Sequence, residues 1–265
     1  MILSGFFALT ASLLYVFASL FIWQKIRLYE KLDLKQQRKR IIWFASGAVI
    51  AHLVSLSLTI WQGEYFIFNF ANSLSMIALL GSLILLLLNR QYRADTLGIF
   101  IFPLAALSTL LPIGFEEHMP LPLEIGSHVL ISIAAYSVMG IATAQAILYS
   151  IQEKRFRKRQ LSNLMRALPP LQVMEDLMFK LIIIGFVLLS FALLSGAFFV
   201  EDLFAQHLVH KTFFAIISWV LYSILLIGHY QQGWRGQTAV KYVIGGYILL
   251  VISFIGTELV LQMLQ

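Results

Sequence analysis

The sequence contains no cysteine, and only 12% of its 265 residues are charged. Without cysteine the chain cannot form disulfides, thiolate metal sites or a covalent bond to haem. A soluble domain carries about 25% charged residues, whereas this chain is 60% hydrophobic and has a mean hydropathy of +0.84. The composition therefore indicates an integral membrane protein and excludes an ordinary soluble fold.

Sequence motifs of common catalytic sites are also missing. No Ser-His-Asp set, phosphate-binding P-loop or HExxH zinc motif is visible in the chain. We therefore expect that this chain is not an enzyme. The net charge is +6, but membrane topology explains where the basic residues lie, so we expect no nucleic-acid partner.

Eight apolar runs each have about the 17–25 residues that a membrane-spanning helix needs. They lie at 5–23, 42–61, 66–89, 96–113, 126–151, 177–199, 209–229 and 239–262. The predicted fold is all-α, a polytopic bundle of eight transmembrane helices, and we expect 1–265 to form a single integral membrane domain. The first run is not expected to be a cleavable signal peptide, because Lys25 and Arg27 follow it and no positive charge precedes it.

The distribution of basic residues predicts the orientation of these spans. With eight spans, eighteen of the nineteen lysines and arginines fall on one side of the membrane, and only Lys211 falls on the other. The largest groups lie in 25–40 and 154–166. Loops rich in Lys and Arg remain in the cytoplasm, so we predict that both termini lie outside it (N-out, C-out).

Three connecting segments are distinctive. The predicted outer loop 111–128 holds three prolines and three glutamates, and we expect it to cap the outer face. The predicted inner loop 152–176 mixes basic and apolar residues around a Pro-Pro pair that stops one segment before the next helix. It is interpreted as topogenic charge with an interfacial amphipathic helix, or as a docking site for a cytoplasmic partner. The turn GWRG (233–236) is predicted to use its glycines for tight geometry and to place Trp234 at the lipid headgroups.

Two of the six histidines are predicted to lie at the same depth near the outer face. His128 opens the fifth apolar run and His210 opens the seventh, and both helices run from outside to inside. Ionisable side chains within a membrane are costly and mark candidate functional sites. We therefore predict that His128 and His210 bind a common ligand, although a lone histidine at a helix end would often only bond a loop carbonyl.

The other four histidines fall elsewhere. His52 is expected near mid-membrane, and His229 ends the seventh run at the inner face. His229 follows His210 by nineteen residues, which is about 28 Å along a helix that rises ~1.5 Å per residue. One small ligand therefore cannot contact both. His118 and His207 lie in predicted outer segments and are expected to be solvated.

Zinc and haem are the two ligands considered for His128 and His210. Zinc usually takes four ligands from Cys, His and carboxylates, so two histidines would need Glu124 or another acid. Haem iron needs only one or two axial side chains and an apolar pocket, and 21 Phe, 10 Tyr and 5 Trp are available to line one. Haem fits these residues better, although spacing alone does not exclude zinc.

The C-terminal half contains five stretches whose order and spacing are informative. They are SHVLISIAAYSVMGIATAQAILY (127–149), LPPLQVMEDLMFKLIIIGFVLLSFALLSGAFF (168–199), HKTFFAIISWVLY (210–222), GWRG (233–236) and GGYILLVISFIGTELV (245–260). Together they resemble the cytochrome c assembly protein superfamily, in its YpjD-like and HemX-like branch, whose relatives include CcsA and CcmC. The resemblance implies a multi-pass protein of the bacterial inner (cytoplasmic) membrane that handles haem at the outer face.

The resemblance also implies roles for single residues. His128 and His210 match outer histidines of the superfamily, which makes them the expected axial ligands of the iron of a non-covalent haem b. His52 and His229 resemble, more loosely, a transmembrane histidine pair, and imply a second, inner haem or a transfer site. The outer motif WGxxWxWD of relatives is absent, and segment 200–209 has no tryptophan. Without this motif, the resemblance fits a haem-binding accessory, sensor or regulatory protein as well as it fits haem presentation.

The function predicted from the sequence is that of a b-type haem-binding membrane protein, which holds haem near the outer face for cytochrome c biogenesis or haem homeostasis. Its expected partners are haem, the lipid bilayer, and cytochrome c maturation proteins or another membrane protein. Two other interpretations remain open. One is a non-haem transporter, or an auxiliary or regulatory subunit of a transport system for a divalent cation. The other is a scaffold that recruits a cytoplasmic partner through 154–166.

Overall fold

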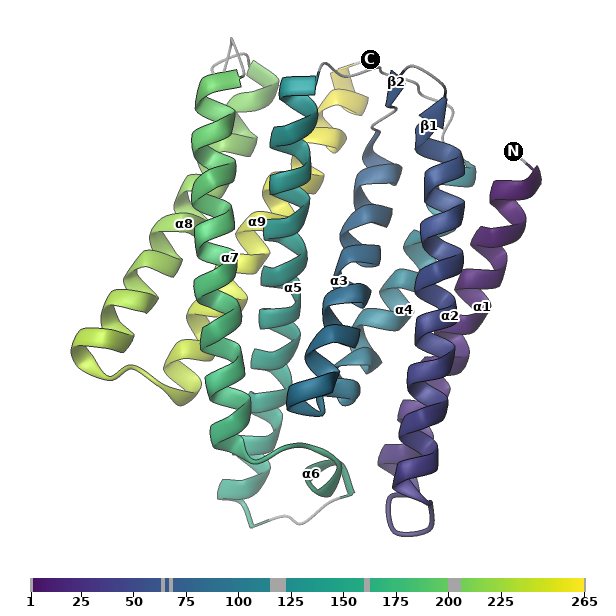
Figure 1. The fold of residues 1–265 in the computed structure, drawn as a ribbon. Helices are drawn as coiled ribbons and strands as arrows, with labels where there is room; N and C mark the ends of the chain where they lie inside the picture. The colour runs from purple at the N-terminus through teal and green to yellow at the C-terminus, as the bar shows by residue number, and fades with distance from the viewer. Residues whose placement is uncertain are drawn as a thin grey trace. The chain divides into compact units, whose positions relative to one another are not determined.

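The computed structural model describes residues 2–62, 65–66, 69–114, 123–159, 163–199 and 206–264. Over these residues it is almost entirely helical (Figure 1). Eight helical segments are long and apolar enough to cross a membrane, which confirms the predicted all-α, eight-span fold. The exception is a small antiparallel hairpin of β1 (Trp61–Gln62) and β2 (Tyr65–Phe66), between the second and third spans.

The helices group into two compact units. Unit 1 is Met1–Leu121 with Gln152–Val173, and unit 2 is Pro122–Ile151 with Met174–Gln265. The boundaries fall inside α5 (Leu123–Arg157) and α7 (Leu171–Phe199), so each of these helices contributes to both units.

In unit 1, α1 (Ile2–Arg27) packs against α2 (Leu34–Ile60). Both helices bury small side chains, which allow helix backbones to approach closely in a membrane. The buried alanines are Ala8, Ala11, Ala18, Ala45, Ala48 and Ala51. α2 begins well before the predicted run 42–61 because Oδ1 of Asp33 accepts the N–H groups of Lys35 and Gln36 at 3.0 and 3.3 Å. The basic segment 35–40 is therefore helical.

The start and end of α3 (Phe70–Tyr92) are set by local capping. Oδ1 of Asn69 accepts the N–H of Asn72 at 2.7 Å, so the helix begins after the predicted position 66. It ends at Tyr92, because the C-cap residue Arg93 has a left-handed φ of 51°, which stops helical propagation.

The predicted fourth span is built from three short helices. These are the 3-10 helix η1 (Ala94–Leu97), α4 (Gly98–Ser108) and the 3-10 helix η2 (Leu111–Ile113). Pro103 lies inside α4 and has no N–H to donate to the preceding turn. Together they form a segment that is long and apolar enough to cross a membrane, as predicted.

Segment 152–176, predicted as one inner loop, is largely helical where the structure describes it. α5 continues to Arg157, and the ion pair between Glu153 and Arg157, 2.7 Å long and one turn apart, supports this extension. α6 (Asn163–Ala167) is a short helix, and α7 starts immediately after the Pro-Pro pair. A helix within this segment was predicted, but the flanking helices extend further into it than the apolar runs indicated, because apolar run length does not detect polar helix ends.

In unit 2, α8 (Gln206–Gln232) and α9 (Gly236–Leu264) pack closely. A Cβ added at Gly246 would lie 2.7 Å from Cζ of Tyr222, so only glycine allows this approach. The hydroxyl of Ser218 donates to the carbonyl of Gly246 at 2.8 Å, and that of Tyr222 donates to the carbonyl of Val243 at 3.2 Å.

The turn between α8 and α9 has the tight geometry that the sequence predicted. Gly233 and Gly236 have φ values of 69° and 59°, which glycine adopts without strain. The indole of Trp234, predicted at the lipid headgroups, packs against its own unit. It stacks on Tyr242 with ring centroids 5.2 Å apart, and a Cβ added at Gly228 would lie 2.4 Å from it.

Candidate functional site

His128 lies near the start of α5 and is bonded to α7. Its Nδ1 lies 2.9 Å from Oγ of Ser195, and the Ser195 hydroxyl donates to the carbonyl oxygen of Ala192 at 3.0 Å. When that hydroxyl donates its single proton to Ala192, its oxygen accepts the bond from Nδ1 of His128. In this arrangement the neutral imidazole carries its proton on Nδ1 and a lone pair on Nε2.

The space for this ring is provided by Gly196. A Cβ added there would lie 3.0 Å from Cε1 and 3.8 Å from Nε2 of His128. The ring is half-buried, and its position is fixed by two consecutive residues of α7, one that bonds it and one that makes room for it.

Lys211, near the start of α8, acts electrostatically on the imidazole of His128. The hydroxyl of Ser253 donates to the carbonyl of Lys211 at 2.7 Å and so connects α8 to α9. His210 immediately precedes Lys211 and lies in α8, which begins at Gln206. It therefore does not open the helix as predicted, and His207, predicted in an outer segment before the helix, is also helical. Several residues of the predicted outer site have side chains outside the described part of the chain: His118, His207, His210, Glu116, Glu117 and Glu124.

His229 lies near the other end of α8 and has a similar arrangement. Its Nδ1 is 2.8 Å from the carbonyl oxygen of Trp234. A carbonyl only accepts hydrogen bonds, so Nδ1 of the ring carries the proton and Nε2 of the neutral ring keeps a lone pair. The ring stacks on Phe179 of α7, with centroids 3.6 Å apart and an interplanar angle of 19°.

His52 of α2 has a different environment in unit 1. It is fully buried, and both ring nitrogens are hydrogen-bonded: Nδ1 with Oη of Tyr15 at 3.3 Å and Nε2 with Oγ of Ser75 at 2.8 Å. Binding of iron by His52 would require breaking one of these bonds. The pairing of His52 with His229 remains a prediction.

The sequence did not indicate the residues that orient these rings. Ser195 is 67 residues from His128, and Trp234 acts through its backbone, so no local pattern marks either contact. Glu175 was also missed: its Oε1 accepts the N–H of Gly236 at 2.8 Å and so caps the first turn of α9.

A zinc site of three or more side chains is not found in the described part of the chain. No group of three His, Asp or Glu residues there could hold a metal ion. Glu124, the carboxylate that the sequence offered for zinc, has its side chain outside this part.

Comparisons with known proteins identify the family. The family described as Cytochrome C assembly protein matches residues 42–265. The inner membrane protein YpjD of Escherichia coli (strain K12) is 29% identical over 160 residues, so the match spans only 60% of that protein and 60% of this chain. The cytochrome c biogenesis protein CcsA of Prochlorococcus marinus (strain MIT 9303) is 25% identical over 272 residues, covering 82% of this chain and 84% of that protein. No solved structure matches. The chain belongs to the cytochrome c assembly protein family and is a multi-pass protein of the inner membrane.

Proposed function

We propose that this protein is a b-type haem-binding membrane protein, which holds haem near the outer face for cytochrome c biogenesis or haem homeostasis. The observation that carries the proposal is the hydrogen-bond relay from His128 through Ser195 to Ala192. Metal-ligating histidines donate their other ring N–H to an acceptor, which fixes the tautomer and the orientation of the ring. His128 has this arrangement, and Nε2 is the ligating atom.

Two further observations support haem as the ligand. The charge of Lys211 acts on the imidazole of His128, and its ammonium would balance the charge of a haem propionate. His210, the proposed second axial ligand, immediately precedes Lys211 in the chain. When bound, haem supplies an iron centre with two axial positions and accessible redox states.

The inner site of the proposal is His229. Its Nδ1 is bonded to the carbonyl of Trp234, and its ring is held by Phe179, so it satisfies the same condition as His128. It would serve an inner haem or a transfer step, with His52 taking part only after losing a hydrogen bond. Cytochrome c maturation proteins are the proposed partners, because the CcsA relative is named for cytochrome c biogenesis.

The proposal is tested by the haem content of purified variants. We expect the wild-type protein, expressed with an adequate haem supply, to contain haem whose iron is six-coordinate and low-spin. His128→Ala and His210→Ala should each give a weaker or high-spin site, and the double variant should retain little haem, because both axial ligands are lost. The measurements are the haem-to-protein ratio and the absorbance spectrum.

His207→Ala is the matched control, because His207 lies one helical turn before His210 in α8. This variant should keep the wild-type spectrum, and His229→Ala should keep the outer haem. Wild-type haem content in the double variant would refute the assignment. A wild-type protein that never contains haem would instead favour the cation-transport alternative.

The outer location of this site depends on the orientation of the chain. Reporters should indicate the cytoplasm when fused after Arg40, Arg93, Arg159 and Arg235. They should indicate the outside when fused after Glu64, after Glu117 and at the C-terminus. The expectation follows from the retention of Lys- and Arg-rich segments in the cytoplasm, and an outside signal at Arg159 would contradict it.

A further inference from the structure

Unit 1 contains a cavity of about 900 Å³ where the basic ends of its helices meet. It is lined by the end of α1, the start of α2, the residues that follow α3, and the segment 166–173. Its charged lining residues are six cations and one carboxylate: Lys25, Lys35, Arg38, Lys39, Arg93, Arg166 and Asp95. The cavity lies on the side of the membrane predicted to be cytoplasmic.

Only part of this positive charge is neutralised within the protein. Nζ of Lys25 lies 2.6 Å from Oδ2 of Asp95, and Arg166 forms an ion pair with Glu30. The other four cations have no ion pair with a carboxylate among the residues that the structure describes: Lys35, Arg38, Lys39 and Arg93. The cavity therefore has a large excess of positive charge.

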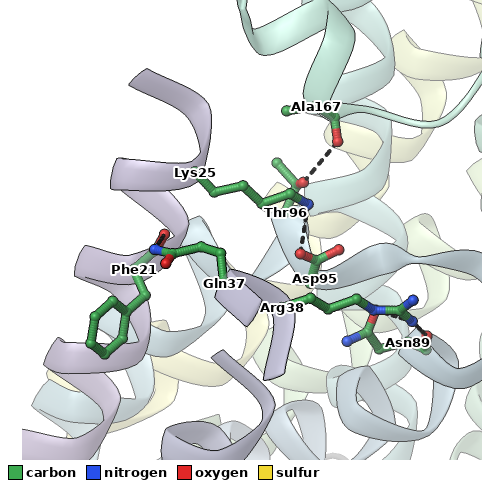
Figure 2. A network of polar contacts seen from close by, with 8 residues as sticks. All are labelled: Phe21, Lys25, Gln37, Arg38, Asn89, Asp95, Thr96 and Ala167. Atoms are coloured by element: carbon green, nitrogen blue, oxygen red, sulfur yellow. Dashed lines mark hydrogen bonds and ion pairs between the residues drawn. The ribbon is translucent and has the colours of Figure 1, made fainter. Parts of the chain in front are cut away.

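Arg38 is held in place within the cavity wall. Its Nη2 donates to the carbonyl oxygen of Asn89 at 2.5 Å and lies 3.4 Å from Oδ1 of the same residue (Figure 2). Its Nε is buried and has no hydrogen-bond partner in the described structure. An unpaired buried donor is unfavourable, so an acceptor from a ligand would satisfy a group that the protein leaves unsatisfied.

The buried ion pair at the cavity has a second unsatisfied atom. The side chain of Asp95 is 1% exposed, and its Oδ1 has no partner within the described residues. Next to it, the hydroxyl of Thr96 donates to the carbonyl of Ala167 at 3.5 Å, which connects η1 to the segment after α6 (Figure 2). A ligand that combines an anion with a hydroxyl or amine could bond to Arg38 and donate to Asp95.

We infer that this cavity binds a phosphate group, carried either by the headgroup of an anionic phospholipid or by a soluble phosphate compound. Guanidinium groups match the geometry of phosphate oxygens, and lysines add charge. Topogenic charge alone would not require a cavity or an oriented guanidinium. The inference is independent of haem binding, and four of the six cations precede residue 42, where the family match begins.

The surroundings favour the lipid as the source of the phosphate. The apolar residues Leu34, Ile42 and Val173 line the same cavity. Trp43, next to Ile42, is 78% exposed and belongs to a helix that can cross a membrane. Basic pockets on the cytoplasmic side of membrane helices are a common arrangement for anionic headgroups.

The test is a titration of thermal stability in a neutral detergent. Phosphatidylglycerol should raise the unfolding temperature of the wild-type protein in a saturable way, because a ligand that binds only the folded state stabilises it, and phosphatidylcholine should not. The double variant Lys35→Gln/Lys39→Gln should weaken the apparent affinity by about tenfold or more, since two charge-assisted contacts are lost. Both lysines are exposed, so the variant should fold. The substitution Arg38→Gln should weaken the apparent affinity for phosphatidylglycerol further.

Lys31→Gln/Arg40→Gln is the matched control, because both residues are exposed, lie in the same segment and do not line the cavity. It should leave the affinity unchanged. Inorganic pyrophosphate is titrated in parallel, and stabilisation by it that depends on Lys35 and Lys39 would support the site and identify a soluble source. No stabilisation by either phosphate compound, or an equal loss in the control variant, would overturn the inference. Haem content is not part of this measurement, so failure here leaves the proposed function untouched.

Discussion

His52 of unit 1 and His128 of unit 2 are both histidines of membrane-spanning helices, yet their hydrogen bonds differ at one atom. His52 is fully buried and bonded at both ring nitrogens, by Tyr15 and by Ser75. His128 is half-buried and held through Nδ1 by Ser195. The first ring is part of a closed polar network that stabilises the fold, whereas the second has its Nδ1 bonded to Ser195, the arrangement that we propose leaves Nε2 for a ligand.

The comparison gives a physical criterion for choosing among intramembrane histidines. Depth in the membrane makes a histidine costly, but the cost can be offset either by hydrogen bonds to both nitrogens or by a ligand at one of them. His229 follows the pattern of His128, because a carbonyl fixes its Nδ1. Among the histidines whose side chains the structure describes, His52 thus has a structural environment, and His128 and His229 are the candidate ligands.

The largest expected effect is the loss of stability in His52→Ala. The substitution leaves the hydroxyls of Tyr15 and Ser75 without their partner and opens a buried cavity. We expect a decrease in the free energy of unfolding of roughly 3 kcal/mol, measured by denaturant unfolding of the haem-free protein in detergent. The haem content per folded molecule should stay at the wild-type level.

His229→Ala is the control for this prediction, because it also removes an imidazole, but from a half-buried position. Its loss of stability should be clearly smaller. If His52→Ala unfolded like the wild type but lost haem as His128→Ala does, then His52 would be a ligand and the criterion would be wrong.

The eight spans could be predicted from the sequence, because the hydrocarbon thickness sets the length of an apolar helix. The helix ends could not be predicted from apolar runs, because polar residues set them. Asn69 delays the start of α3, and Asp33 starts α2 before its apolar run. The pattern Asp33-x-x-Gln36 is a local signal for such a start. Because of this earlier start, Lys35 and Lys39 lie on a helix, where they line a cavity.

The candidate site could be predicted only in part. The depth of His128 and His210 follows from their places in the apolar runs. The hydrogen bond with Ser195 could not be predicted, because it joins residues 67 positions apart and depends on the packing of α5 against α7. The role of Phe179 at His229 depends on tertiary structure in the same way, whereas the Trp234 carbonyl lies only five residues from His229, in the turn 233–236.

A smaller effect, on haem affinity, is expected for Ser195→Ala, which removes the hydrogen-bond partner of Nδ1 of His128. Without Oγ, the ring loses the acceptor that fixes its tautomer and orientation. Loss of such an orienting partner lowers metal affinity by roughly tenfold, so the haem affinity in a titration of the haem-free protein should fall by this factor. Ser223→Ala is the control, because that hydroxyl donates to the carbonyl of Trp219 within its own helix. An unchanged affinity in Ser195→Ala would show that the relay does not support the ligand.

The smallest expected effect is that of Gly196→Ala, which leaves the hydrogen bond of His128 in place but takes away space. The added Cβ would lie 3.0 Å from Cε1 of the ring, closer than an ordinary van der Waals contact, so the imidazole must shift by a few tenths of an ångström. Because ligand geometry must be kept within about 0.5 Å, we expect a loss of haem affinity smaller than the roughly tenfold loss in Ser195→Ala, with a partial change toward high spin. Gly126→Ala is the control, because a Cβ added there meets nothing within 4 Å. If Gly196→Ala reduced haem affinity no more than Gly126→Ala and left the spin state unchanged, the ring of His128 would not be the iron ligand, even if its removal destabilised the outer site.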